Sequence, residues 1–442
     1  MYTSFIGKKF LKIYCEKYNK GHDYSASQFF ADEMFSLFFE SDKHLMHVGN
    51  SPFFQKPKEE DVVKHGSKAL TQFFNFRKKI NKGVPSGDIY VGFGAEEIQA
   101  TSSGQLTSID FKTSSEDMYA SWIGEALGIG VNGGFVMLIN EELILLALFN
   151  GWKQYRKYLQ QTPNVKDKQI ETWNGNWLNH SFQKDFDSNN PMDDFKVEFT
   201  EIEGKLGIST QKWSKIIFSL SKKYGSKTIT SYCYNLSQTN TTLGFINIYL
   251  PEILRFYELR NKVFINEHEN NLSSEEIEKL ETFFNFKSAC KSGTIGLKSL
   301  EPSKLREFMA KGSADYAQGK DYKFSDKNSY TIYSLYKLWI IAMLNKTELL
   351  KLASDCANAL IQIEGNNDKS NRGKTDKAQE SANIRGAKNL REFIENLTQI
   401  LDKDNAETFK EVVDQVVKMP ADNFPLFITL IRFEYSYKKN KN

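Results

Sequence analysis

The chain has 442 residues, of which 40% are hydrophobic and 26% charged, with only 9 prolines and 27 glycines, so bulk disorder and fibrous structure are excluded. At about 100–200 residues per domain, this length predicts two or three domains. The 58 basic and 55 acidic side chains leave a net charge of +3, so a nucleic-acid function would depend on where the charges lie and not on their sum.

The sequence gives little support for a metal site, a disulfide framework or a membrane-spanning segment. The four cysteines, at positions 15, 233, 290 and 356, are never closer than 57 residues, so no CxxC zinc motif or disulfide framework is expected. The longest apolar stretch, residues 135–149, contains the Glu141-Glu142 pair and predicts a core segment, not a membrane span. Lysines interrupt the apolar residues at the start, unlike a secretory signal. We expect a cytoplasmic protein with no membrane contact, no metal site and no cofactor.

The first 150 residues predict helices followed by a small sheet. Phenylalanines and leucines between Phe29 and Phe38 recur at helical spacing after the start signals Ser25 and Ser27. From about residue 84, glycines separate short β-prone runs such as Ile89–Val91, and residues 135–139 read as a further strand.

The rest of the chain becomes steadily more helical. An acidic loop leads into a strand expected at Phe195–Ile202, helices are expected across 252–286 with a capping box at Ser273, and a polar connector covers about 287–328. Four apolar stripes of period 3.6 follow, over Tyr330–Glu364, Ala382–Asp402, Glu407–Met419 and Phe424–Tyr437. The sequence therefore predicts an α+β protein, with a mixed α/β body over residues 1–325 and an antiparallel helical bundle over 326–442.

Three motif-like patterns do not support a site. The GxGxxG match at 128–133 precedes an expected strand, where a dinucleotide site needs a helix, so we interpret it as a glycine turn after a helix that ends near Leu127. Gly373-Lys374-Thr375 lacks the first glycine of a P-loop, since position 368 is Asp. His44 and His47 have no third ligand nearby in the sequence and predict a surface or half-buried pair.

One pattern is compatible with catalysis. Asp88, Asp110 and Lys112 loosely match the PD-(D/E)XK nucleases, in which carboxylates hold Mg²⁺ and the lysine supports the attacking water or the phosphate. Position 87 is Gly where the pattern has Pro, and an exposed hairpin with a surface Asp and Lys explains the same residues. A Mg²⁺-dependent restriction-type DNA endonuclease is therefore the alternative function.

The main statistical feature is a stretch without carboxylates. The 48 residues from Gly204 to Pro251 contain no Asp or Glu, where the chain average of 55 in 442 gives about six, and they contain six lysines. Such a stretch removes repulsion from a phosphate path, and its aromatic and amide side chains suit stacking and base-edge contacts. We therefore favour nucleic-acid contact, with an ordinary solvated basic face as the alternative interpretation. The candidate contacts are Lys212, Lys215, Lys222, Lys223, Lys227, Asn235, Gln238 and Asn240, interleaved with Trp213, Tyr224, Tyr232 and Tyr234.

A second basic run lies near the C-terminal helices. Arg385, Lys388 and Arg391 are spaced i, i+3, i+6, which predicts a cationic ridge on one side of a helix whose other side is apolar. The alternative is an ordinary wet helix face.

Three segments give the chain a resemblance to a known family. These segments are Asn150–Arg156 (NGWKQYR), Thr172–Trp177 (TWNGNW) and Met419–Phe433, which contains MP and FPLFITLIRF. With the α/β body followed by a helical bundle, they resemble the large subunit of the type I CRISPR Cascade complex, in the divergent forms found with subtypes I-A and I-B.

The resemblance implies a DNA-binding role without catalysis. It implies recognition of the protospacer-adjacent motif in double-stranded target DNA, stabilisation of the displaced single strand, binding to CRISPR RNA-bound backbone subunits, and recruitment of a helicase-nuclease in trans. The carboxylate-free stretch would then contact the duplex, and Arg385, Lys388 and Arg391 the displaced strand. A purely protein-binding scaffold, whose 34 phenylalanines serve interfaces, is a third possibility.

Overall fold

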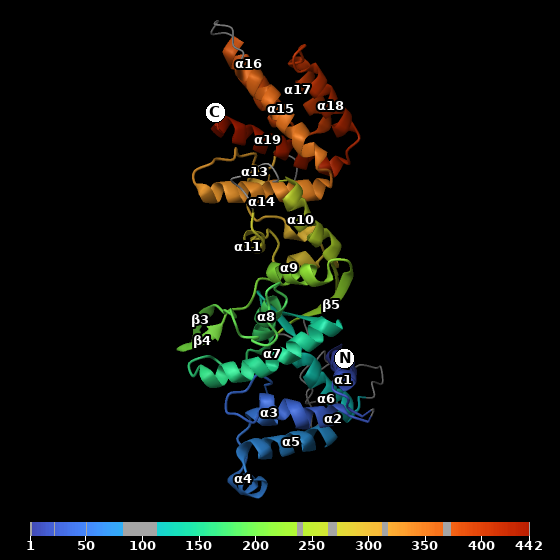
Figure 1. Ribbon diagram of the computed structural model, residues 1–442, viewed down its shortest axis with the longest axis vertical. Helices are drawn as coiled ribbons and strands as arrows, with labels where there is room; N and C mark the ends of the chain where they lie inside the picture. The colour runs from blue at the N-terminus through green and yellow to red at the C-terminus, as the bar shows by residue number, and fades with distance from the viewer. Residues whose placement is uncertain are drawn as a thin grey trace, which may run out of the picture. The chain divides into compact units, whose positions relative to one another are not determined.

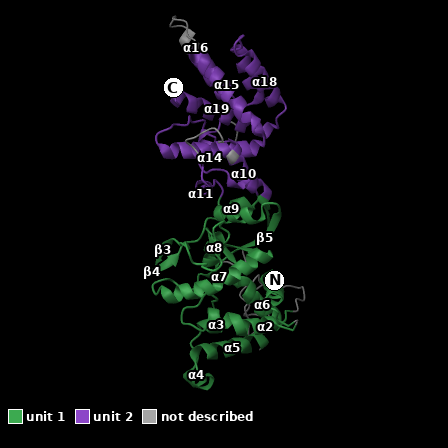
Figure 2. Cartoon of the chain, in the orientation of Figure 1, with its two compact units in different colours: residues 1–250, 285–295 green, residues 251–284, 296–442 purple. Residues whose placement is uncertain are grey.

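The computed structural model describes residues 2–21, 23–49, 51–82, 113–236, 242–263, 272–311, 317–365 and 373–441. The chain folds into two compact units, coloured separately in Figure 2. The first unit comprises Met1–Leu250 and Asn285–Ile295, and the second comprises Pro251–Phe284 and Gly296–Asn442. The chain therefore passes from unit 2 into unit 1 at residue 285 and back into unit 2 after residue 295.

Capping and aromatic packing organise the first helices of unit 1. Ser25 and Gln28 form a capping box, so the helix begins where the sequence predicts, and it continues through a π-helical turn. The ring of Phe30 in this turn stacks on Phe76 of α5 at 4.9 Å, which holds the two helices side by side (Figure 1). The helices are α1 (Tyr2–Lys17), α2 (Ala26–Phe29), η1 (Phe30–Met34), α3 (Phe35–Phe38), η2 (Pro52–Phe54), α4 (Glu59–His65), α5 (Lys68–Lys82) and α6 (Ser115–Ala126).

A five-stranded mixed sheet forms the centre of unit 1. The strands are β1 (Ile129–Val131), β2 (Phe135–Ile139), β5 (Thr228–Asn235), β6 (Thr242–Tyr249) and β7 (Thr294–Ile295), in the order β1-β2-β5-β6-β7. All neighbours are antiparallel except β6 and β7, which are parallel. A separate hairpin joins β3 (Phe199–Ile202) and β4 (Lys205–Ile208), and the remaining helices are α7 (Glu142–Gln161), α8 (Ile170–Ser181), α9 (Trp213–Tyr224) and α12 (Phe286–Cys290).

Two glycines let α1 and α6 cross at backbone contact. A Cβ atom on Gly7 would overlap the carbonyl oxygen of Ala120, and one on Gly124 would overlap the carbonyl oxygen of Thr3. Only glycine fits at both points, because a displaced backbone cannot yield as a flexible side chain does. The crossing places the first turn of α1 against the sheet, where Tyr2 contacts Tyr232 of β5 at 4.9 Å between ring centroids.

Unit 2 is built from helices around a buried ion pair. Lys337 and Glu434 lie 3.0 Å apart with both side chains almost fully buried, and the hydroxyl of Tyr333 donates to Glu434 at 3.1 Å. The elements are α10 (Leu250–Val263), α11 (Ser274–Glu278), η4 (Leu297–Leu300), α13 (Leu305–Phe308), α14 (Lys327–Leu344), α15 (Glu348–Gly365), α16 (Gly373–Arg385), α17 (Leu390–Gln399), α18 (Ala406–Val417), η5 (Ala421–Asn423) and α19 (Phe424–Lys441). Residues 251–284 and 296–325, which we placed in the N-terminal body, lie in this unit.

The protein is α+β, as the sequence predicts. The strand at Phe135–Ile139 is confirmed, but the predicted glycine turn is shorter than expected: Ile129–Val131 form the strand β1, and only residues 132–134 form the turn between β1 and β2. The capping box at Ser273 is also confirmed. The strand expected at 195–202 is shorter and covers only Phe199–Ile202.

Two expected helices are each divided in the structure. Tyr330–Glu364 breaks at Asn345, which ends α14 in the left-handed region with φ 55°. Ala382–Asp402 breaks between Arg385 and Leu390, because Asn389 caps a new helix through its side chain. Among the described helices, none combines the length and the apolar character of a membrane span.

Candidate nucleic-acid interface

The carboxylate-free stretch forms the end of the β3–β4 hairpin, α9, β5 and β6 of unit 1. Most of its aromatic residues turn out to be core residues. Trp213 and Tyr224 are buried in α9, and buried Tyr234 donates its hydroxyl to Glu125 at 2.7 Å. Of the four interleaved aromatic residues, Tyr232 is the most accessible, so stacking by the other three is not supported.

The predicted lysines lie at the two ends of α9. Lys212 and Lys215 are at its first turn and Lys222 and Lys223 in its last turn, where ammonium groups also favour the negative end of the helix dipole. Lys227, just before β5, does not present a free charge, because its Nζ lies 2.7 Å from Glu141. This carboxylate is 86 residues away in the chain, so the sequence of the stretch alone could not reveal it.

The three amide candidates are less informative. Asn235 is half-buried at the end of β5, opposite Phe135 of β2. Gln238 and Asn240 lie outside the described residues, as do the nuclease candidates Asp88, Asp110 and Lys112.

The predicted cationic ridge is not one helix face, and this prediction is wrong. Arg385 ends α16, Lys388 lies in the connector, and Arg391 begins α17. The guanidinium of Arg385 lies 3.7 Å from the ring centroid of Tyr435 and 3.7 Å from Glu364, so it binds helices together. Arg391 is exposed but forms an i,i+4 pair with Glu395 at 2.8 Å.

The structure instead reveals an open sheet face, which we define as Thr228, Thr230, Tyr232, Phe245, Asn247, Tyr249 and Thr294. Register places these residues opposite one another on β5, β6 and β7, and the alternating residues such as Ile229 and Ile248 are buried on the other face. Phe245 is 60% exposed and Tyr249 42% exposed. Between the rings, the Thr230 hydroxyl donates to the Asn247 amide oxygen at 3.0 Å.

The first turns of α1 extend this face with further rings. Tyr2 lies 5.5 Å from Phe5, 4.9 Å from Tyr232 and 5.1 Å from Phe245, measured between ring centroids. These four residues form an aromatic cluster in which Phe5, like Phe245, remains exposed. The ammonium of Lys9 lies 5.5 Å from the Phe5 ring, and it forms no salt bridge within the described part of the chain.

The three segments that build the face all lack carboxylates. No Asp or Glu occurs before Glu16, between residues 204 and 251, or between residues 285 and 300. The first segment also carries Lys8, Lys9 and Lys12, and the part of the third segment that belongs to unit 1, residues 285–295, carries Lys287 and Lys291. Carboxylates from elsewhere do reach these segments, since Asp117 of α6 pairs with Lys8 at 2.5 Å and Glu141 pairs with Lys227 at 2.7 Å.

Sequence reasoning missed Tyr2, Phe5, Phe245 and Tyr249. The alternation of polar or aromatic residues with isoleucines in Thr228–Thr230 and Phe245–Tyr249 was a usable signal, because a strand with one wet face alternates in this way. The contribution of α1 had no such signal, since it depends on the Gly7 and Gly124 crossing.

The residues that carry the family resemblance are core residues. Trp152, Tyr155, Trp173 and Trp177 are buried, and their ring and indole contacts join α7 to α8, as in the 4.7 Å stack of Tyr155 on Trp173. Most side chains of α19 from Phe424 to Tyr435 are buried as well. These segments therefore account for packing within each unit and supply no exposed nucleic-acid contact. No protein-family model, curated protein or solved structure matches the chain.

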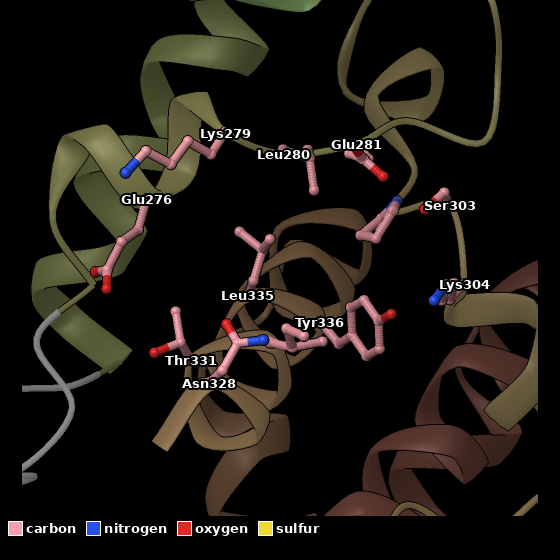
Figure 3. A pocket seen from close by; sticks show the side chains of 12 residues that line it. Glu276, Lys279, Leu280, Glu281, Ser303, Lys304, Asn328, Thr331, Leu335 and Tyr336 are labelled. Carbon is pink, nitrogen blue, oxygen red and sulfur yellow. The ribbon is translucent and has the colours of Figure 1, made fainter. Parts of the chain in front are cut away.

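Two other features are not part of the interface. A cavity of about 410 Å³ in unit 2 lies between α11, residues 302–304 and α14, and Leu280 and Leu335 point toward each other across it (Figure 3). Its rim carries both Glu276 and Lys279 and holds none of the predicted site residues. Among the described residues, no group of three His, Cys, Asp or Glu side chains is arranged to hold a metal ion.

Proposed function

We propose that the protein binds single-stranded nucleic acid on the open sheet face. The observation that carries the proposal is that three segments far apart in the chain, each free of carboxylates, meet at one surface with exposed aromatic rings. Aromatic side chains on a sheet stack on unpaired bases of any sequence, and lysines around them attract the phosphate backbone. The threonine hydroxyls and the Asn247 amide add hydrogen-bonding groups between the rings.

The family resemblance makes the proposal more specific. In this reading, the bound strand is the DNA strand displaced in an RNA-guided type I CRISPR complex in the cytoplasm. The chain is then the non-enzymatic large subunit, which recognises the protospacer-adjacent motif, binds the CRISPR RNA-bound backbone subunits, and leaves cutting to a helicase-nuclease. The residues that carry the resemblance are buried, so this part rests on the resemblance in sequence and not on the open sheet face.

The test is the double substitution Tyr232→Ala/Phe245→Ala. Each stacked base contributes about 1–3 kcal/mol, so the variant should bind single-stranded DNA at least about tenfold more weakly than wild type. Affinity is measured by fluorescence anisotropy with a labelled mixed-sequence oligonucleotide at about 0.1 M salt, since higher salt masks phosphate contacts.

Phe199→Ala is the matched control. Phe199 is a similarly exposed phenylalanine on β3, outside the open sheet face, and its removal should leave the affinity unchanged. Equal affinity of the double variant and wild type, with both proteins folded, would reject the proposed interface.

A further inference from the structure

A cavity in unit 1 shares no lining residue with the open sheet face. It has a volume of about 670 Å³ and is lined by residues 39–44 after α3, residues 53–56 of η2 and beyond, the start of α5 at 67–72, and Lys168. We call it the α5 pocket. Its volume is that of a typical small-molecule site, which ranges over about 300–1,000 Å³.

Buried hydrogen bonds fix the irregular segments that form the walls. The guanidinium of Arg156 donates to the carbonyl oxygens of Leu37 and Lys43. The ammonium of Lys43 donates in turn to the carbonyl oxygens of Leu159, Thr162 and Pro163, at the end of α7. On the other wall, the amide of Gln72 donates to the carbonyl oxygens of Phe53 and Gln55 at 2.9 and 2.8 Å. The concave shape is therefore set before any ligand arrives.

Lys168 is held in an unfavourable backbone conformation at the pocket. Its φ is 63°, in the left-handed region where a lysine is strained by about 1–2 kcal/mol and a glycine is not. Its amide donates to the carbonyl oxygen of His44 at 2.8 Å, and its ammonium lies 4.8 Å from the ring centroid of Phe54. A glycine at this position would avoid the strain but would carry no charge. The lysine keeps the strain and places a positive charge at the pocket.

The pocket presents more positive than negative groups. Its lining includes three lysines, Lys56, Lys68 and Lys168, and two carboxylates, Glu40 and Asp42. Lys56 and Lys68 form no salt bridge to any described residue, whereas Lys168 lies 3.6 Å from Asp167.

Cationic side chains surround His44. Burial lowers the pKa of His44 to about 4, with Lys168, Arg156 and Lys68 lowering it further and Asp167 opposing them. The Nδ1 atom of His44 is buried and finds no hydrogen-bond partner in the described structure.

We propose that the α5 pocket binds a small phosphate monoester of nucleotide size. The phosphate accepts hydrogen bonds from the ammonium groups of Lys68 and Lys168, with Lys56 adding charge. The body of the ester lies against the apolar wall at Phe54. Charge-assisted hydrogen bonds of this kind are among the stronger interactions in proteins.

The test uses phenyl phosphate, which joins a phosphate monoester to a flat apolar body, in calorimetric titrations of the full chain. Wild type should bind it with a dissociation constant between about 1 µM and 1 mM, and should bind phenol too weakly to measure. Lys68→Ala and Lys168→Gly should each weaken binding about tenfold or more, because each removes a charge-assisted hydrogen bond.

Lys168→Gly separates binding from folding, because it relieves the backbone strain and should leave the melting temperature equal or higher. Lys78→Ala, an exposed lysine of α5 outside the pocket, is the matched control and should bind as wild type does. Absence of binding at about 1 mM, or equal binding by wild type, Lys68→Ala and Lys168→Gly, would overturn the proposal.

A further comparison keeps this inference distinct from the proposed function. The Tyr232→Ala/Phe245→Ala variant should retain phenyl phosphate binding, and loss of binding in this variant alone would place the ligand on the open sheet face and refute the pocket. Oligonucleotides with and without a 5′-phosphate identify the source of the ester. A preference for the phosphorylated end that Lys68→Ala removes assigns it to a strand end, and no preference assigns it to a free small molecule.

Discussion

Two buried glutamates in unit 1 have strongly raised pKa values. Glu125 on α6 and Glu171 on α8 are both buried, and Tyr234 donates a hydrogen bond to Glu125. Burial raises the pKa of Glu125 to about 7, and burial together with the charge of Glu125 raises the pKa of Glu171 to about 8. A buried carboxyl without a cationic partner holds its proton well above its usual range.

These shifts predict a loss of stability as the pH rises. The folded chain keeps protons that the unfolded chain releases above about pH 4.5, so the free energy of unfolding falls between about pH 4.5 and pH 8 and is level above that. Glu171→Gln removes the ionisation, so it should flatten this fall and make the protein more stable than wild type at pH 8. The gain should be on the order of a few kcal/mol, since one pKa unit corresponds to about 1.4 kcal/mol.

Urea unfolding at several pH values, followed by tryptophan fluorescence, measures this effect. Five of the six tryptophans lie in unit 1, so the signal reports mainly on that unit. Glu201→Gln, an exposed carboxylate on β3, provides the control and should keep the wild-type slope. The assignment fails if the wild-type and Glu171→Gln curves run parallel.

At the scale of elements, the crossing of α1 and α6 positions half of the aromatic cluster. Gly124→Ala would force a methyl group into the backbone of α1 at Thr3. Overpacking of this kind costs about 1–3 kcal/mol, so the variant should melt at a lower temperature than wild type. Because the strain moves α1, and with it Tyr2 and Phe5, single-stranded DNA binding should weaken as well.

Gly21→Ala is the comparison for this prediction, since a Cβ atom there would meet open space. It should leave both the melting temperature and the DNA affinity unchanged. A Gly124→Ala protein that melts and binds as wild type does would show that the close crossing is not needed.

Helices and strands with strong local signals could be predicted from the sequence, whereas the tertiary contacts that their residues make could not. The capping residues Ser25 and Ser273 and the short apolar run of β2 after a glycine turn are local signals, so their elements appear where expected. The break at Asn389 was missed because the apolar stripe continues across it, although its side-chain cap starts a new helix. The pairing of Lys227 with Glu141 depends on tertiary contact and has no signal in the stretch itself.

At the scale of the whole molecule, sequence analysis identified one carboxylate-free stretch, whereas the fold brings three carboxylate-free segments together. The segments before Glu16 and between 285 and 300 are too short to stand out by composition. Their meaning emerges only because α1 crosses α6 and because segment 285–295 returns from unit 2 to add β7 to the sheet. The sequence could therefore predict that the candidate site is a carboxylate-free surface, but it could not predict which residues form that surface.

Photo-crosslinking tests the central claim directly. Single-stranded DNA carrying 5-iodouracil is irradiated in complex with the full chain, and the crosslinked peptides are identified by mass spectrometry. Because the base must lie against a ring to react efficiently, we predict crosslinks at Tyr2 or Phe5, at Tyr232, and at Phe245. Crosslinks confined to the helices of unit 2, or to α9, would contradict the account.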